Sequence, residues 1–187
     1  LKEDWPNQPV TIIKKISKDG NKTKIGFESE FDYNKRCAVE YGQICLDQDI
    51  LTVPAVPYGK FEVCDLLDVE NKRLIHVKKS SRQSSVLSHF FKQGSNSARI
   101  LKTFPEAREV LVQKVRELAG DQVGDKLQEA LEEPINGWRV EFHVADAPRN
   151  DGSFTIPFFS RITLRDETRF LKGMNFDVAL RFIPAVE

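Results

Sequence analysis

The sequence predicts an α/β domain with a mixed central sheet flanked by helices. Its 187 residues suit one ordinary domain. Its 40% hydrophobic residues, 13 Phe among them, are enough to fill a core. Strand patterns come first along the chain, and later strands alternate with helices. Because a strand that re-enters a sheet after a helix usually lies parallel to its neighbour, we expect at least one parallel pair and helices on the sheet faces.

The first part of the chain predicts a hairpin, a short helix and a strand. Residues 18–21 (KDGN) are a good turn sequence between two apolar runs. Tyr33 and Cys37 are four residues apart, as on one face of a helix, and Glu28 and Glu30 lie near its start, where the helix dipole favours carboxylates. The expected elements are strands over 10–16 and 24–27, a helix over 31–41, a strand over 43–53 and a turn over 54–59.

The rest of the chain predicts a second hairpin and then helices that alternate with strands. Residues 60–69 and 73–79 are strand-like runs around a short turn, and the connector 80–85 offers a Ser as helix N-cap. The segment 105–119 is the strongest helix, because Pro and Glu open it and Gly120 closes it. The further expected elements are helices over 86–101 (with a break at Gly94), 124–133 and 164–172, an interior strand over 138–145 and a final strand over 177–183.

Charge and cysteine usage narrow the class of protein. The formal net charge is zero, which argues mildly against unspecific coating of nucleic acid and leaves room for a local basic patch. Three cysteines without CxxC spacing favour neither a disulfide framework nor a zinc site, so a reducing, cytoplasmic location is expected. No signal peptide and no apolar run of about 18 residues is present. The chain opens at Leu, so we expect a piece of a longer polypeptide.

The second hairpin carries the residues best suited to chemistry. Residues two apart in a strand share a face, so His76 and Lys78 are expected to point the same way, while Glu62 and Asp65 lie on the preceding strand. Carboxylates can hold a divalent ion, and a lysine beside them can steady the attacking water or the scissile phosphate. The alternative is an ordinary charged hairpin, in which Glu62 pairs with Lys78 across the strands.

The run after the hairpin is rich in hydrogen-bonding side chains near a predicted helix start, an arrangement that suits phosphate. An ordinary capped helix is an equally good interpretation. The candidate nucleic-acid-binding residues are Lys79, Ser84, Ser85, His89, Lys92 and Arg99. His89 and His143 lack the spacing of zinc ligands, and no Gly-x-Ser-x-Gly motif or Gly-rich phosphate loop is present.

Several short motifs carry a family resemblance. They are Glu30 with Tyr33-Asn34 and Ala38, Cys45-Leu46-Asp47, FEVCDLL at 61–67, IHVKK at 75–79, SSVLSHFFKQG at 84–94 with Ser97-Ala98, and PFFS at 157–160. Together, from about residue 28 to 183, they resemble the C-terminal region of a sporadically distributed bacterial family of unknown function. That family is often met in mobile or defence-associated gene neighbourhoods.

The resemblance implies a core similar to the restriction-endonuclease-like nucleases, which runs helix, three strands, helix, strand. It assigns Glu30 as the helix acid, Asp65 or Glu62 as the strand acid and His76-Val77-Lys78 as the third element. Gln93 resembles a glutamine that some members carry on the following helix. His76 stands where an acid is expected, so the domain is either an active variant, favouring Mn²⁺, or a degenerate binder.

These observations lead to three hypotheses. The first is a metal-dependent nuclease-like domain acting on DNA or RNA in defence, with Mg²⁺ or Mn²⁺ held by Asp65, Glu30 and His76. The second is a non-catalytic nucleic-acid- or protein-binding module of a larger defence protein. The third is a homo-oligomerisation domain whose contact surface is the Phe-rich segment 154–159. In each, residues 1–27 form an N-terminal hairpin or linker and 28–187 the α/β domain, with no membrane partner.

Overall fold

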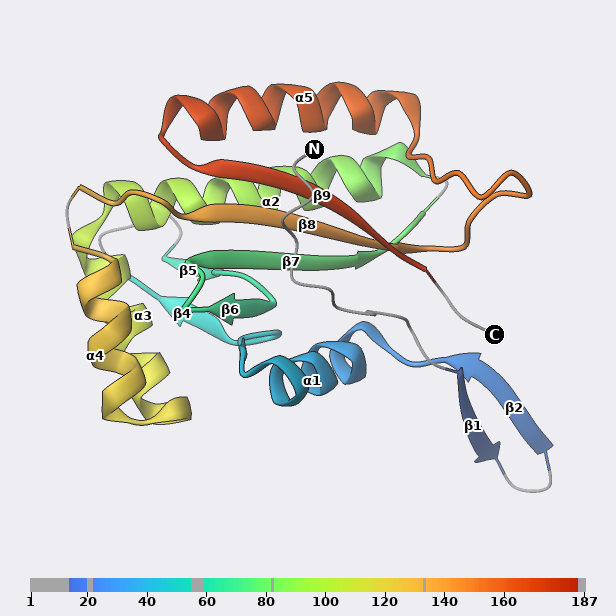
Figure 1. The fold of residues 1–187 in the computed structure, drawn as a ribbon, viewed down its shortest axis with the longest axis horizontal. Coiled ribbons are helices and arrows are strands. Elements are labelled where there is room, and N and C mark those ends of the chain that lie inside the picture. The colour runs from blue at the N-terminus through green and yellow to red at the C-terminus, as the bar shows by residue number, and fades with distance from the viewer. Residues whose placement is uncertain (1–13, 20–21, 55–58, 82, 133, 185–187) are drawn as a thin grey trace.

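The fold centres on a five-stranded mixed sheet of order β3-β6-β7-β8-β9 (Figure 1). The computed structural model describes residues 14–19, 22–54, 59–81, 83–132 and 134–184. The first two pairings are antiparallel and the last two are parallel, as expected for strands that re-enter after helices. The α/β class with a mixed sheet is therefore confirmed. The strands are β3 (Ile44–Cys45), β6 (Leu66–Asp68), β7 (Arg73–Lys79), β8 (Arg139–Asp146) and β9 (Asp177–Pro184).

Helices cover both faces of this sheet. On one face, Tyr33 and Cys37 of α1 pack on Ile75 and Val77 of β7. On the other face the larger core gathers around Phe142 of β8, beneath α2 and α5 (Figure 1). None of the described helices is long and apolar enough to cross a membrane. The helices are α1 (Glu30–Tyr41), α2 (Ser84–Thr103), α3 (Pro105–Ala119), α4 (Asp121–Ala130) and α5 (Phe158–Gly173).

Two small antiparallel pairs stand beside the main sheet. The predicted N-terminal hairpin is confirmed as β1 (Lys14–Asp19) paired with β2 (Lys22–Phe27), while 10–13 lies outside the described residues. A second pair joins β4 (Ile50–Thr52) to β5 (Lys60–Glu62).

Two strands expected as continuous are each broken in two. The run 43–53 turns after β3, where the Asp49 N–H donates to the Leu46 carbonyl and Gln48 has a φ of 67°, which no strand accepts. The run 60–69 breaks at residues 63–65, because β5 pairs with β4 whereas β6 pairs with β7. These breaks place polar side chains where the sequence pattern predicts regular strand.

Helix boundaries also differ from expectation. The expected break at Gly94 is absent, since α2 runs unbroken from Ser84 to Thr103. No Ser caps that helix: Gln83 is its N-cap residue and makes no side-chain cap hydrogen bond. The helix expected from residue 164 begins already at Phe158. Inside the Phe-rich segment, Phe158 and Phe159 are exposed.

Gly94 of α2 lies directly against side chains of β7 and β8. A Cβ there would lie 2.6 Å from Cε1 of Phe142 and 3.0 Å from Cδ2 of His76. Gly94→Ala should therefore lower the free energy of unfolding by about 1–3 kcal/mol, measured by chemical denaturation. The matched change is Gly173→Ala in α5, where an added Cβ meets no atom within 4 Å. That variant should be neutral, or stabilising by up to about 1 kcal/mol, and an equal loss in both variants would contradict the packing argument.

Candidate functional site

The site lies along the part of β7 that β6 leaves uncovered. Pairing with β6 ends at Leu66 opposite Ile75, so the N–H groups of Val77 and Lys79 meet none of the described strands on that side. Two carboxylates replace the missing strand. Oδ2 of Asp65 accepts from the Val77 N–H at 2.6 Å, and Oε1 of Glu30 accepts from the Lys79 N–H at 2.8 Å. Carboxylate oxygens thus take the place of strand carbonyls as the hydrogen-bond acceptors along this edge of β7.

The carboxyl of Asp65, at this edge, has a strongly raised pKa. Its backbone N–H donates to the Ile75 carbonyl, which fixes the residue beside β7. Burial raises the pKa of its carboxyl to about 7, opposed by the Val77 hydrogen bond and reinforced by the negative charges of Glu62, Asp47 and Glu30. Near neutral pH the carboxyl therefore exchanges its proton readily, and a nearby cation would drive the proton off.

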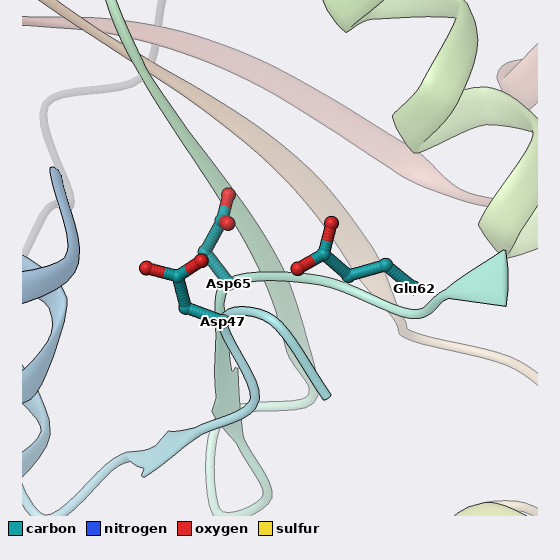
Figure 2. A group of neighbouring side chains, drawn as sticks. All are labelled: Asp47, Glu62 and Asp65. Carbon is teal, nitrogen blue, oxygen red and sulfur yellow. The ribbon is translucent and has the colours of Figure 1, made fainter. Parts of the chain in front are cut away.

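Three carboxylates converge at Asp65 (Figure 2). Asp47 follows β3, Glu62 ends β5 and Asp65 precedes β6. One oxygen from each lies within 4.8 Å of the others, a spacing that could hold a metal ion. The convergence results from the two broken strands, which bring three chain segments to one point. We call Asp47, Glu62 and Asp65 the acid cluster.

Neighbouring groups orient the acid cluster. Nδ2 of Asn34 donates to Oδ2 of Asp47 at 3.1 Å, and the N–H of Gln48 donates to Oε1 of Glu62 at 2.7 Å. Nε2 of Gln93 donates to Oε2 of the same Glu62 at 3.1 Å. Each bond leaves further lone pairs on the carboxylates for another ligand.

The donor chemistry of the acid cluster fits a hard divalent cation. All of its side-chain ligand atoms are carboxylate oxygens, which Mg²⁺ and Mn²⁺ favour. Asn34 is fully buried, and its Oδ1 accepts no hydrogen bond from any residue the structure describes. A buried amide oxygen next to Asp47 is a polar group that a hydrated cation would satisfy.

Lys78 lies at the same edge of β7. Its Nζ is 2.9 Å from Oε2 of Glu30, and both side chains are partly exposed. The alternative expectation, a cross-strand pair of Glu62 with Lys78, is wrong: Glu62 instead bonds to Gln48 and Gln93. Glu30 uses one oxygen on Lys78 and the other on the Lys79 backbone, and it lies outside the group of oxygens within 4.8 Å. It therefore holds Lys78 in place.

His76 is not brought to the acid cluster. It is 3% exposed on the face of β7 that α2 covers, stacked at 5.8 Å on Phe142 and edge-on at 6.4 Å to Phe90. Burial, and the nearby His143, lower the pKa of His76 to about 3, so the ring is neutral. Of the three predicted metal ligands, only Asp65 belongs to the cluster. His76 is part of the core, because α2 covers the face on which it lies.

The predicted nucleic-acid-binding residues divide into two groups. His89, Lys92 and Arg99 are exposed and line one groove together with Glu62 and Gln93. The other three lie outside the lining of this groove. Lys79 is half-buried, and its backbone N–H donates to Glu30. The Ser84 carbonyl accepts a hydrogen bond from the Ser160 hydroxyl, and Ser85 is exposed in the first turn of α2.

Asp47 is the member of the acid cluster that sequence reasoning missed as a site residue. The signal is its place in Asp47-Gln48-Asp49, a pair of acids that interrupts an apolar β-branched run. Acids are poor strand formers, so this interruption marks a turn. Asp49 points elsewhere, to an ion pair with Lys114 at 2.6 Å.

The raised pKa of Asp65 makes a testable prediction about stability. An unfolded Asp ionises near pH 4, whereas the folded one keeps its proton to about pH 7, so folding loses stability as pH rises through this window. Asp65→Asn removes this loss. Relative to the native chain, the variant should be equally stable near pH 4 and more stable by up to about 4 kcal/mol at pH 8, measured by denaturant titration at each pH. A difference that does not grow with pH would contradict the assignment, and Asp49→Asn is the matched control.

Comparisons with known proteins give a family. No curated protein matches the chain, and no solved structure matches it. One family model matches residues 4–184, which is nearly the whole length. The chain therefore belongs to this family, which is described as a family of unknown function, DUF6119.

Proposed function

We propose that this chain is a metal-dependent nuclease-like domain that hydrolyses phosphodiester bonds of DNA or RNA. The observation that carries the proposal is the acid cluster beside the Lys78–Glu30 ion pair, at one uncovered strand edge. Oxygen ligands and a lysine at one edge are the components of metal-assisted phosphodiester hydrolysis. A role in defence against foreign nucleic acid rests on the resemblance of the central motifs alone.

The order of elements supports a restriction-endonuclease-like core. Helix α1 is followed by β3, β6 and β7 as three antiparallel strands of the main sheet, with the β4–β5 pair between β3 and β6. Helix α2 comes next, and β8, parallel to β7, follows after α3 and α4. This is the order helix, three strands, helix, strand that such nucleases share. The chain departs from their pattern at His76, and Asp47 and Glu62 supply carboxylates that a third-strand acid would otherwise give.

Each residue then has a role. Asp47, Glu62 and Asp65 would hold a Mg²⁺ or Mn²⁺ ion, which when bound neutralises phosphate charge and activates water. Lys78 contributes a positive charge at the strand edge, for the scissile phosphate or the attacking water. Glu30 fixes the Lys78 ammonium by the 2.9 Å ion pair, and Gln93 fixes Glu62. With His76 in the core, the candidate ligands among the described residues are all carboxylate oxygens, which Mg²⁺ prefers.

A cleavage assay tests this function. Purified protein is incubated with single- and double-stranded DNA and RNA in Mg²⁺, Mn²⁺ or EDTA. We expect divalent-dependent cleavage of at least one substrate, and Lys78→Ala should reduce it at least about 100-fold by removing the charge that stabilises the transition state. Lys172→Ala, an exposed lysine in the last turn of α5, is the control. Cleavage that survives Lys78→Ala, or none on any substrate, would overturn the proposal.

Two observations favour a second function, a non-catalytic binding module of a larger protein. The ammonium of Lys78 is already neutralised by Glu30, and the Asp65 carboxyl holds its proton to about pH 7. A domain of this kind would bind nucleic acid or protein in EDTA and show no cleavage in any metal. The same assay, combined with a binding measurement, separates the two functions.

A further inference from the structure

A groove runs along α2 next to the acid cluster. It has a volume of about 870 Å³ and lies between α2 and the strand β5. On α2 it is lined by His89, Lys92, Asn96, Arg99 and Thr103, spaced three or four apart and so on one helix face. This face extends over about 20 Å at 1.5 Å per residue.

The charge of the groove is unbalanced. Lys60 of β5 and Lys92 and Arg99 of α2 are exposed along it. Within the described ranges none of these three cations forms an ion pair, although acids pair with cations at many other places on the chain. Glu62 is the acid among the lining residues, and it belongs to the acid cluster. The groove therefore offers positive charge along its length and carboxylates at one point, on a chain with zero net charge.

The groove also has an apolar wall. Phe61 of β5, Ile100 of α2 and Phe104, between α2 and α3, are each half-buried and line it. Aromatic rings beside cations are the combination that binds single-stranded nucleic acid, with bases stacked on rings and phosphates on cations. A duplex keeps its base faces stacked inside and presents only their edges, so it has nothing to place on these rings.

The groove and the acid cluster meet at Glu62. Glu62 belongs to both, and Gln93 lines the groove while donating to Oε2 of Glu62. A strand held along α2 would thus pass its backbone directly over the acid cluster. At about 3.4 Å per stacked nucleotide, the helix face spans about six nucleotides.

We propose that this groove binds single-stranded nucleic acid, with phosphates on Lys92 and Arg99 and bases against Phe61 and Phe104. The proposal names the substrate class of the nuclease-like site and so rests on the proposed function. It selects a single strand as the form of nucleic acid that reaches the acid cluster. Whether the strand is DNA or RNA is separated by the two arms of the test.

The test is a binding measurement in EDTA, so that no cleavage interferes. Fluorescence anisotropy is recorded with labelled oligothymidylate and oligouridylate of about ten nucleotides, over a series of salt concentrations. The double variant Lys92→Ala/Arg99→Ala should weaken binding at least about tenfold and reduce the slope of log affinity against log salt by about 1.4. The double variant Arg169→Ala/Lys172→Ala removes two exposed cations of α5 as the matched control. It should leave both quantities unchanged.

A second variant tests the apolar wall. Phe104→Leu keeps apolar volume but removes the ring, so binding should weaken at least about fivefold without a change in salt slope. A duplex of the same length should bind the native chain more weakly than either single strand. The groove proposal would be overturned by equal losses of binding in the groove and α5 double variants, or by a salt slope that the groove double variant leaves unchanged. Tighter binding of the duplex than of either single strand would also overturn it.

The two proposals fail in different ways. Absence of cleavage in the metal assay leaves the EDTA binding result intact and overturns only the nuclease function. Normal cleavage together with unaltered binding by Lys92→Ala/Arg99→Ala overturns only the groove. Thermal melting checks that each variant is folded, which we expect because Lys92 and Arg99 are exposed and Phe104→Leu keeps an apolar side chain.

Discussion

Asp65→Asn is expected to reduce metal-dependent cleavage by about three orders of magnitude. Asp65 is the member of the acid cluster closest to β7, where its Oδ2 accepts the Val77 N–H at 2.6 Å. An Asn keeps a carbonyl oxygen for that hydrogen bond but carries no negative charge to bind a cation. A loss of about 4 kcal/mol of charge stabilisation corresponds to this factor.

The measurement is the cleavage rate at saturating metal, with Asp49→Asn as the matched variant. Asp49 lies in the same turn as Asp47 but forms an ion pair with Lys114, so its substitution should leave cleavage unchanged. Asp65→Asn is expected to stabilise the fold at neutral pH, and the denaturant titration of the same variant checks that a loss of activity does not come from unfolding. Retained cleavage in Asp65→Asn would remove Asp65 from the metal site.

The pKa of Asp65 adds a pH dependence to the same experiment. Below about pH 7 the carboxyl of the native chain is protonated, and cation binding must release that proton. Metal affinity measured by calorimetry should therefore rise from pH 5.5 to about 7 and level off above it, with proton release that vanishes at the higher pH. Asp65→Asn should lose this pH dependence.

Local pattern was sufficient for most of the sheet and helices. The alternation and apolar content of β7 and β8 and the opening Pro and closing Gly of α3 predict their elements almost to the residue. The broken strands were not predictable in the same way. Their breaks depend on which strand pairs with which, since β5 pairs with β4 and β6 with β7, and such pairing is a long-range property.

The candidate site shows the same limit of prediction from local sequence pattern. Asp65, Lys78, Glu30 and Gln93 were identifiable because their motifs place them on known elements, and the structure brings Gln93 to Glu62 and Glu30 to Lys78. His76 was misplaced because alternation tells which residues share a face but not which face a helix will cover. Asp47 was missed because its relation to Asp65 arises only when two chain turns meet.

The second large effect on cleavage is expected at Glu30, which is either a metal ligand or the residue that fixes Lys78. Both oxygens of Glu30 are engaged, one by the Lys79 N–H at 2.8 Å and the other by Lys78 Nζ at 2.9 Å. Glu30→Gln keeps an oxygen for the backbone but removes the charge that fixes the ammonium. We expect cleavage at saturating metal to fall about 10- to 100-fold, while metal affinity changes less than about threefold.

Asp47→Asn should give the opposite result. Its carboxylate belongs to the acid cluster, so calorimetric metal affinity should fall about 100-fold, which is a loss of about 2.7 kcal/mol of binding free energy. Much of the cleavage rate should return when metal is raised to saturation, because Asp65, which is fixed to β7 by the Val77 N–H, still holds the ion beside Lys78. The crossed pattern separates the two roles, since a purely structural defect would lower rate and affinity together. A large loss of metal affinity in Glu30→Gln would return Glu30 to the metal site. In that case the 2.9 Å ion pair would have to open when the cation binds.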